Sequence, residues 1–280
     1  MGIDKNRSRN LPTFANINLL GKCNADCFFC LGKDISWSEE HGSLISSHFS
    51  EWPHFQEFLV RCKHYAIVLM YVTGQTADPL QYAFLEPLIR SLQNVHGFRV
   101  GLRTNGIAWH PGCSSIMECR RRIGYTINTL CPDRQEMICG VRNLPDWSRI
   151  LDESPPCRVS VVVCTHNHDE IEDIISFCST YRSVQYVQLR RISTDHRTEE
   201  LKDHARSHDE LSERLLNKYG EHGKLWGNSE VMTINGLQVV LWRTTQTTIS
   251  SINYFIDGTI SDNYFIVEGY ERERDNHDRR

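Results

Sequence analysis

The sequence predicts an α/β protein in which a parallel sheet curls into a partial (β/α)6 barrel. Short apolar runs alternate with amphipathic segments six times between residues 11 and 194. This region carries almost no β-hairpin signal, so helices in right-handed crossovers are expected to join successive parallel strands. The length of 280 residues also suits a single barrel of this kind. We therefore expect residues 11–194 to form one core barrel.

Six segments are predicted to form the strands of this barrel. Residues 65–72 and 158–164 are nearly continuous apolar runs, which are typical of parallel strands buried on both faces. The first strand is expected over residues 13–20, where apolar and polar residues alternate. The remaining three strands are expected over residues 97–103, 123–130 and 184–192.

Helices are predicted between the strands, from apolar residues that recur three and four positions apart. One helix is expected to begin at Ser50, which would act as its N-cap, with Glu51 in its first turn. Its buried face would carry Phe55, Phe58 and Leu59. Further helices are expected over residues 79–95, 114–121, 145–152 and 170–181.

The pattern changes after residue 194. Residues 195–224 are highly charged and contain a predicted helix over residues 198–219. Residues 229–270 are rich in Val, Ile, Thr and Tyr, and they carry Asn-Gly and Asp-Gly pairs that are strong hairpin signals. We expect residues 195–270 to form a helix and an antiparallel β extension that covers the open side of the barrel. Residues 271–280 are expected to be a disordered tail.

The composition is that of an ordinary soluble protein and argues against several classes of function. The formal net charge is -4. The sequence has no excess of basic residues that would indicate nucleic acid as a partner. Charged residues interrupt every long apolar run before the ~20 residues that a membrane span needs. Residues 1–10 are polar, and the odd number of 11 cysteines favours a reducing compartment. We therefore expect a cytoplasmic protein without membrane contact.

Three cysteines directly after the first strand carry the strongest chemical signal. Cys23, Cys27 and Cys30 are spaced C-x3-C-x2-C, and no fourth cysteine or histidine stands close by. A structural zinc ion normally takes four protein ligands. Iron–sulfur clusters are held by cysteine thiolates, usually four of them. Three thiolates in one loop therefore suit a cubane cluster with one iron open to another ligand. A zinc-stabilised or iron–sulfur protein without catalysis is the alternative.

The ends of other predicted strands converge on this loop. In parallel α/β folds the chemistry lies at the carboxyl ends of the strands, in the loops that lead to the next helix. Residues 73–78, 104–106 and 165–169 all follow predicted strands and are expected at the same edge as the cysteines.

The cysteine spacing, with the aromatic Phe29 directly before the last cysteine, resembles the signature of the radical S-adenosylmethionine (radical SAM) superfamily. The resemblance runs from about residue 14 to residue 192, roughly two-thirds of the chain. Within the superfamily it is similar to the branch that includes MoaA, a molybdenum-cofactor enzyme, and the peptide-modifying enzymes. It implies a radical SAM barrel with a [4Fe-4S] cluster on Cys23, Cys27 and Cys30, whose open iron binds SAM.

The resemblance also implies which residues bind SAM. Thr73-Gly74-Gln75 takes the place of the family's Gly-Gly-Glu motif, which binds the methionyl amino group through its backbone. Asn128 would contact the carboxylate or the ribose, and the adenine would lie at Phe29 and Leu189. The full set of implied cofactor contacts is Phe29, Thr73, Gly74, Gln75, Thr104, Asn105, Asn128, Asn167 and Leu189. A turn, cap or core role is the alternative for the last five.

The chemistry implied by the resemblance is that of a radical SAM enzyme. The reduced cluster would cleave SAM, and the resulting 5′-deoxyadenosyl radical would abstract hydrogen from a small-molecule substrate in specialised natural-product or cofactor biosynthesis. Modification of a ribosomal peptide is the alternative within the family. An electron donor such as flavodoxin or ferredoxin would be a partner. No residue is identified as catalytic.

Further cysteines and aromatic residues leave open questions about this chemistry. The last cysteine is Cys178, so the β-rich extension offers no thiols for a second cluster of the SPASM or twitch type. Four further thiols are loosely spaced, and whether they bind a metal or a second cluster is left open. They are Cys113, Cys119, Cys131 and Cys139. Four residues of the extension are candidate substrate contacts: Trp242, Tyr254, Asp257 and Tyr264. Sheet packing would equally explain the three aromatic residues, and a hairpin turn would explain Asp257.

Overall fold

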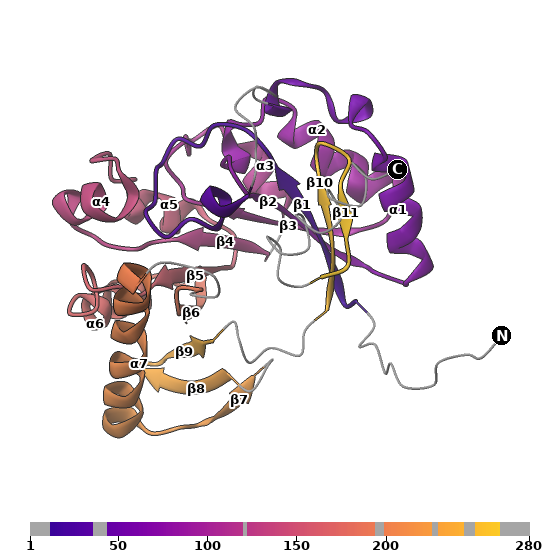
Figure 1. Cartoon of the computed structure of the whole chain (residues 1–280). Helices are drawn as coiled ribbons and strands as arrows, with labels where there is room; N and C mark the ends of the chain where they lie inside the picture. The colour runs from indigo at the N-terminus through magenta and orange to yellow at the C-terminus, as the bar shows by residue number, and fades with distance from the viewer. Residues whose placement is uncertain are drawn as a thin grey trace.

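All strands in the described part of the chain belong to one mixed sheet of eleven strands. The structure is a computed structural model and describes residues 12–35, 44–119, 122–193, 199–225, 229–243 and 250–263. The strands are β1 (Phe14–Leu19), β2 (Leu69–Gly74), β3 (Arg99–Thr104), β4 (Ile123–Thr126), β5 (Cys157–Val162), β6 (Val184–Arg190), β7 (Gly223–Leu225), β8 (Ser229–Ile234), β9 (Leu237–Trp242), β10 (Ser251–Phe255) and β11 (Ile260–Ser261). Their order is β11-β10-β1-β2-β3-β4-β5-β6-β9-β8-β7 (Figure 1).

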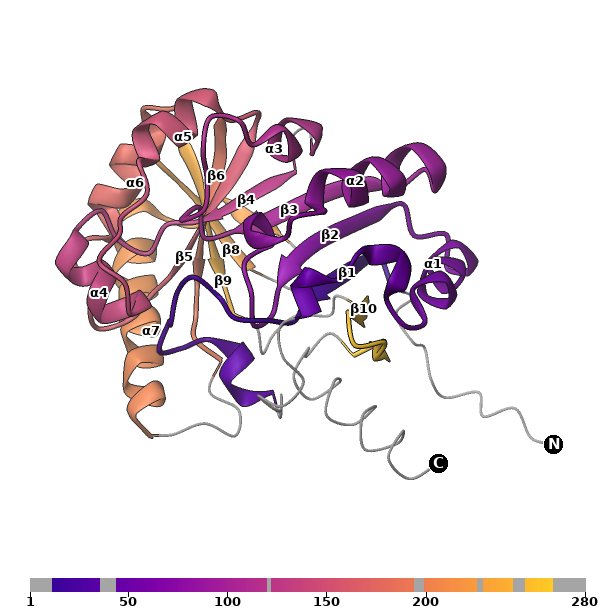
Figure 2. The ribbon, with the colours of Figure 1, turned by 90° about the horizontal axis from the view of Figure 1, so that it is seen from above.

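Helices follow one another along the outer side of this sheet (Figure 2). They are α1 (Phe55–His64), α2 (Leu85–Arg90), α3 (Ser114–Glu118), α4 (Pro132–Cys139), α5 (Trp147–Glu153), α6 (Ile171–Ser179) and α7 (Glu199–Tyr219). Alternate residues of β1, such as Ile17 and Leu19, are buried in one core with helix residues such as Phe58 and Leu88. Each such side chain contributes about 1.5–3 kcal/mol through its burial.

The six predicted core strands are present and parallel. From β1 to β6, each strand pairs in parallel register with the next along the chain. The apolar runs that predicted these strands are buried because helices cover one face of the sheet. The α/β class with successive βα units is therefore confirmed.

The C-terminal strands extend this parallel sheet at both edges. The two predicted hairpins are present, since β8 pairs antiparallel with β9 and β10 with β11. However, β9 pairs in parallel with β6, and β10 in parallel with β1. The extension is therefore antiparallel within itself, as predicted, whereas its parallel pairing with β1 and β6 was not predicted. A hairpin's own sequence determines its turn but not the strand it joins, so local patterns miss this pairing.

Several predicted boundaries near the N-terminal half are also wrong. Ser50 lies in a 3-10 turn, η4 (Phe49–Glu51), and is not the N-cap of a helix. Helix α1 begins only at Phe55, because His54 has a φ of 55° and interrupts a helical path. Strand β2 begins at Leu69 and not at residue 65, because Ala66 has a φ of 53°.

The helix predicted over residues 79–95 is divided into three pieces. These are the 3-10 turn η5 (Pro79–Gln81), α2, and a π-helical turn, η6 (Ser91–Val95). Helix α4 was not predicted, because its sequence is polar and has little periodicity. Its flanking signals are Pro132 at the first position and Gly140 just after the end, the usual asymmetry of helix termini.

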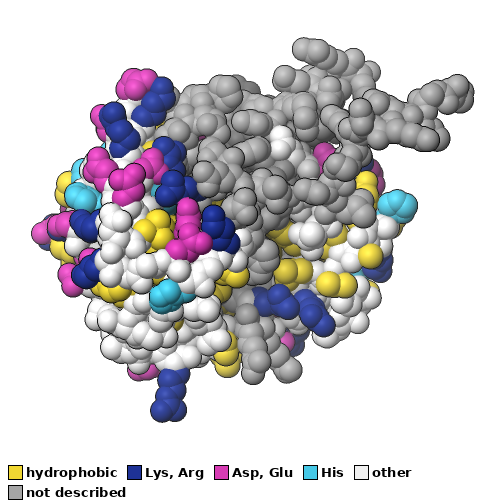
Figure 3. Space-filling model, turned by 90° about the horizontal axis from the view of Figure 1, so that it is seen from below, with side chains coloured by type: hydrophobic (Ala, Val, Ile, Leu, Met, Phe, Trp, Pro, Cys, Tyr) yellow, Lys and Arg dark blue, Asp and Glu magenta, His cyan; other side chains and the backbone are white. Residues whose placement is uncertain are grey.

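Acidic and basic side chains stand side by side on the described part of one face (Figure 3). Among the described helices, none combines the length and apolar composition needed to cross a bilayer. Tyr264 and the tail predicted over residues 271–280 lie outside the described residues.

Candidate active site

The cysteine loop leaves the carboxyl end of β1 and lies against the loop that follows β2. The backbone N–H groups of Gln75 and Thr76 donate to the carbonyl oxygen of Leu19, at 3.0 and 3.3 Å. In return the N–H of Gly21 donates to Oγ1 of Thr76 at 2.8 Å. These bonds connect the end of β1 to the end of β2, so both loops lie at one edge of the sheet, as predicted.

The Cys23 end of the loop is held by polar side chains from two neighbouring loops. The N–H of Asn24 donates to Oε1 of Gln81 at 3.1 Å. The amide of Asn105 donates to Oδ1 of Asn24 at 2.8 Å and lies 3.8 Å from Sγ of Cys23. Asn105 therefore connects the turn after β3 to the first cysteine.

Asp78 fixes that turn and was missed by the sequence reasoning. Its carboxylate accepts Oγ1–H of Thr104 at 2.8 Å and N–H of Asn105 at 2.7 Å. It also accepts N–H of Leu80 at 2.9 Å and forms a capping box with Gln81. Burial raises the pKa of Asp78 above its usual range, with these donors acting in the opposite direction. The available signal was Asp directly before Pro79, with Gln three residues later.

The Cys27 end of the loop packs on a small apolar cluster that is separate from the main core. We call this cluster the satellite cluster; its buried members are Ile138, Cys139, Cys164, Ile192 and Ala205. Cys27, Phe28 and Phe29 pack against it. Phe28 also lies 4.5 Å from the ring of His204, measured between ring centroids.

Backbone hydrogen bonds join this end of the loop to the last turn of α4. The N–H of Asp26 donates to the carbonyl of Cys139 at 2.7 Å, and that of Phe28 to the carbonyl of Ile138 at 3.2 Å. Gly140 has a φ of 66°, and a Cβ there would lie 2.9 Å from Cβ of Asp26. Only glycine allows so close an approach at this position.

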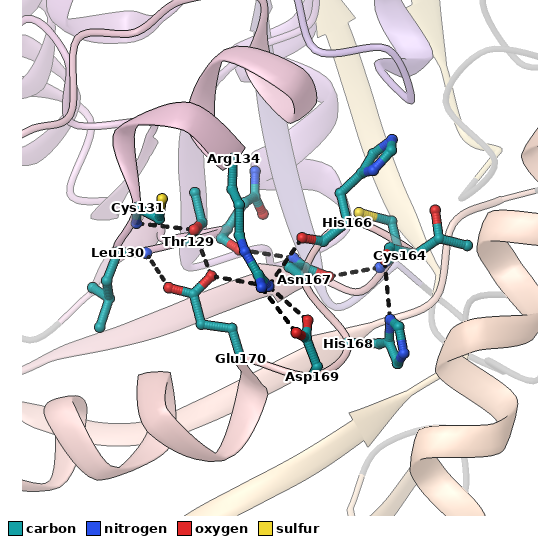
Figure 4. Close-up of polar contacts among 12 residues, drawn as sticks. Thr129, Leu130, Cys131, Arg134, Cys164, His166, Asn167, His168, Asp169 and Glu170 are labelled. Carbon is teal, nitrogen blue, oxygen red and sulfur yellow. Dashed lines mark hydrogen bonds and ion pairs between the residues drawn. The ribbon is translucent and has the colours of Figure 1, made fainter.

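The far end of α4 is clamped to the loop after β5 (Figure 4). Arg134 donates two hydrogen bonds to the carboxylate of Asp169, at 2.6 and 2.8 Å. Glu170 accepts from Oγ1 of Thr129 at 2.5 Å and from N–H of Leu130 at 2.8 Å. Arg134 holds the pKa of Asp169 down to about 2. This clamp orients α4 and was not foreseen from the sequence.

The three predicted cluster ligands are half-buried on this one loop. The sulfur of Cys30 accepts the N–H of Gly32 at 3.4 Å and caps the 3-10 turn η1 (Leu31–Asp34). Burial raises the pKa of Cys23 to about 11. Among the described residues, no three His, Cys, Asp or Glu side chains are gathered closely enough to hold a metal ion.

The donor set nevertheless fits an iron–sulfur cluster. The loop presents three thiols from residues that follow one another at one edge of the sheet, and thiolates are the ligands of such clusters. Thiols with raised pKa values would lose their protons on binding metal. Hydrogen bonds to the loop after β2 and packing on the satellite cluster hold the cysteine loop at this edge of the sheet.

The predicted cofactor contacts fall into an edge group and a buried group. Thr73 and Gly74 end β2, Gln75 follows directly, and the carbonyl of Gln75 lies 3.9 Å from Sγ of Cys30. A Cβ on Gly74 would lie 1.3 Å from the carbonyl oxygen of Ala77, so this turn requires glycine. Thr104 and Asn105 form the adjacent turn, and Phe29 packs on the satellite cluster.

The buried group ties strand ends together. The amide of Asn167 donates to the carbonyls of Asn128 and Val162 at 2.7 and 2.9 Å. Oδ1 of Asn128 accepts the N–H of Val162 at 3.0 Å. Leu189 is buried in the main core on β6. These contacts give both asparagines a role in joining the ends of β4 and β5.

The remaining sequence candidates lie elsewhere in the sheet. Tyr254 is buried in an aromatic group with Phe55 and Phe58. Trp242 ends β9 and is buried. Asp257 lies in the β10–β11 turn and accepts the N–H of Thr259 at 2.9 Å.

Comparisons with known proteins find similarity in sequence and in fold. No family model matches the sequence. The GTP 3′,8-cyclase of Clostridium perfringens (strain 13 / Type A) is 24% identical over 190 residues, which are 64% of this chain and 56% of that protein. The chain thus spans little more than half of this curated relative.

Solved structures share the fold at low sequence identity. Streptococcus suis SuiB bound to its precursor peptide SuiA aligns with a TM-score of 0.63 at 12% identity, over 91% of this chain and 60% of that chain. SuiB bound to S-adenosylmethionine aligns with a TM-score of 0.57 at 12% identity, over 91% and 58%. With the cysteine loop at the edge of the parallel sheet, the sequence similarity to the GTP 3′,8-cyclase and the shared fold with SuiB support the predicted resemblance to the radical SAM superfamily.

Proposed function

We propose that this chain is a radical SAM enzyme that acts on a small molecule, in specialised natural-product or cofactor biosynthesis. Cys23, Cys27 and Cys30 would hold a [4Fe-4S] cluster with SAM at its open iron. The observation that carries the proposal is the position of three thiols on one loop, at the edge where the parallel strands end. The curvature of the sheet along its parallel strands would form the partial barrel around the substrate.

Some residues around the cysteines would bind SAM, and others would exclude water from the site. When bound, the cluster and SAM supply reductive cleavage of SAM and, through it, hydrogen abstraction from the substrate. The edge group would hold SAM, with the backbone at Gly74 and Gln75 and the turn at Thr104 and Asn105 closest to the cysteines. The aromatic side chain of Phe29 would exclude water on the other side.

The full set of proposed SAM contacts includes the buried group. Asn128, Asn167 and Leu189 are buried, so they would shape the wall of the site from behind and contact SAM less than the edge group. Most of the side-chain polar atoms of the two asparagines already bond backbone groups at or just beyond the ends of β4 and β5. The proposed roles of these three residues are therefore chiefly structural.

A ribosomal peptide is the second candidate substrate. The likeness to SuiB bound to its precursor peptide, with a TM-score of 0.63, favours it. The sequence relationship to the GTP 3′,8-cyclase favours a small molecule instead. In both cases flavodoxin or ferredoxin in the cytoplasm would supply the electron.

Anaerobic reconstitution with iron and sulfide tests the proposal. The protein is expected to become brown, to bind about four iron atoms per chain, and to release 5′-deoxyadenosine from SAM when dithionite is added. Replacing Cys23, Cys27 and Cys30 together with Ala should abolish both properties. Replacing Cys62, a buried cysteine of α1 distant in sequence from the loop, should leave both unchanged. A colourless protein that binds only zinc would contradict the proposal, and so would cleavage that survives the triple change.

A further inference from the structure

Positive charge gathers on the inner face of the sheet, which is the face opposite the helices. Successive side chains of a strand point to opposite faces. On β5, Val159 and Val161 are buried in the main core, so Arg158 and Ser160 belong to the inner face. All charged residues within β1–β6 are arginines. These parallel strands therefore contribute cations and no acidic side chain, which favours an anion beside them.

Arg158 is a half-buried cation on this face. Its Nη1 donates to Oε1 of Gln188 on β6 at 2.7 Å. Among the described residues, no carboxylate forms an ion pair with its guanidinium. A guanidinium carries five N–H donors in a planar fork, so further donors of Arg158 are available to a ligand.

The amide of Gln188 is oriented by its two neighbours. Arg158 can only donate, so the oxygen of Gln188 must face it and the NH2 group must face away. Oγ of Ser160 donates to the same oxygen at 3.3 Å. Gln188 is only 5% exposed, yet its NH2 group has no hydrogen-bond partner in the described part of the chain. A buried donor without an acceptor is costly, so this group indicates a missing acceptor beside Arg158.

Two glycines make room for large planar side chains on the same face. A Cβ on Gly124 of β4 would lie 2.8 Å from Nε of Arg158, so the guanidinium lies across that strand. A Cβ on Gly101 of β3 would lie 2.5 Å from the ring of Tyr71, and the guanidinium of Arg103 lies 4.3 Å from the centre of this ring. Arg103 and Arg158 pair in register with Gly124 from its two sides. Two arginines thus flank a position without a side chain.

We propose that Arg158 and Gln188 bind an oxyanion of the substrate, a phosphate or carboxylate group, on the inner face of the sheet. The inference rests on the proposed function and assigns an anionic substrate to it. Arg158 would contact the anion through two N–H groups, because its fork matches the spacing of two oxygens in either group. The NH2 group of Gln188 would supply a third donor.

The depth of Arg158 favours the substrate over SAM as the source of this anion. Arg158 lies four positions before Val162, where β5 ends. Four residues of a strand span about 13 Å. The proposed SAM contacts and the cysteines lie at the edge where the strands end, so the body of the substrate would lie between its anion and SAM.

Binding of inorganic phosphate to the reconstituted full-length protein tests the inference, with the ³¹P nuclear magnetic resonance line width of phosphate as the readout. We expect saturable binding to the wild type. Arg158→Gln should weaken it about ten- to hundredfold, the effect of losing a charge-assisted hydrogen bond. The matched control is Arg182→Gln, which removes the same charge at an exposed position and should leave binding unchanged.

Gly124→Ala tests the geometry without removing a charge. The added Cβ would displace the guanidinium of Arg158, so phosphate should bind more weakly than to the wild type. This variant also serves the comparison if Arg158→Gln does not fold. Displacement of phosphate by acetate then ranks the two kinds of oxyanion.

Three outcomes would overturn the inference. The first is a wild type without saturable phosphate binding, and the second is equal binding by the wild type and Arg158→Gln. The third is displacement of phosphate by saturating SAM, which would assign the anion to the carboxylate of SAM. Failure of the wild type to bind iron would contradict the proposed function instead, because the phosphate titration does not depend on the cluster.

Discussion

The two ends of the cysteine loop are held by different kinds of force. At the Cys23 end, Asn105 and Gln81 reach the loop through hydrogen bonds of defined length and direction. At the Cys27 end, the loop packs on the satellite cluster, with two backbone bonds to α4. Hydrogen bonds specify where an atom lies, whereas apolar packing chiefly contributes stability. The comparison suggests that the first end sets the geometry of the site and the second end anchors it.

The largest expected effect comes from weakening the apolar anchor. Ile138→Ala should lower the free energy of unfolding by about 3 kcal/mol, because it leaves a cavity at a fully buried position. Urea unfolding measures this loss. In the metal-free protein, alkylation of Cys27 should also become faster than that of Cys23, as the anchored end opens locally.

Met137 is the matched control for that change. It precedes Ile138 on the same helix but its side chain is 57% exposed, against 0% for Ile138. Met137→Ala should therefore change the free energy of unfolding by less than about 0.5 kcal/mol. Equal losses from the two variants would contradict the assignment of Ile138 to the anchor.

The next effect comes from the polar end. Asp78→Asn should cost about 2 kcal/mol of unfolding free energy, because an amide NH2 group would face the buried donors of Thr104 or Asn105. The alkylation pattern should be reversed, with Cys23 faster than Cys27. Asp173→Asn, at an exposed position of α6, is the control and should be close to neutral. An unchanged ratio of the two alkylation rates in Asp78→Asn would contradict the division of the loop into two ends.

A smaller effect is expected at Gln81. Its Oε1 accepts the N–H groups of both Asn24 and Asp78, at 3.1 Å each. Gln81→Ala should lower the free energy of unfolding by about 1 kcal/mol. Gln81→Glu keeps the acceptor oxygen and should recover most of that loss in thermal or urea unfolding. If both variants were equally unstable, the hydrogen bond to Asn24 would not be what holds the loop.

The smallest effect concerns the clamp at the far end of α4. Arg134 lowers the pKa of Asp169 to about 2. The carboxylate therefore stays ionised to a lower pH in the folded protein than in the unfolded chain. The pair therefore stabilises the fold above the ordinary Asp pKa of about 4. That contribution is lost as the pH falls from about 4 towards 2.

Asp169→Asn tests this clamp. Because the side chain of Asp169 is 58% exposed, the substitution should cost less than about 1 kcal/mol at pH 7. The difference from the wild type should decrease between pH 4 and pH 2, as measured by urea unfolding at each pH. A difference that stays constant with pH would contradict the role given to the Arg134–Asp169 pair.

Local patterns predict the core of this fold well, and its edges poorly. The apolar run of β5 and the Asn-Gly turn between β8 and β9 are local signals, and both elements are present. The pairing of β10 with β1 brings Asn16 to Asn253, 237 positions away, where their amides hydrogen bond at 2.7 Å. Such pairing depends on which edges of the sheet the other strands leave open. A local sequence pattern does not contain this information.

The candidate site shows the same division. The spacing of Cys23, Cys27 and Cys30 predicted the loop and its position after β1. The residues that hold the loop were missed, although Asp78 before Pro79 and the Pro132–Gly140 flanks of α4 are local signals that could have indicated them. The contact between Cys27 and Cys139 is tertiary, because it requires α4 to pack beside the loop.

The central claim is that three protein thiolates leave one iron of the cluster open to SAM. Its most direct test is the electron paramagnetic resonance spectrum of the reduced, reconstituted protein, recorded without SAM and again with saturating SAM. We predict that SAM changes the spectrum of the wild type, because it becomes a ligand of the cluster. A reduced cluster whose spectrum is the same with and without SAM would contradict the claim.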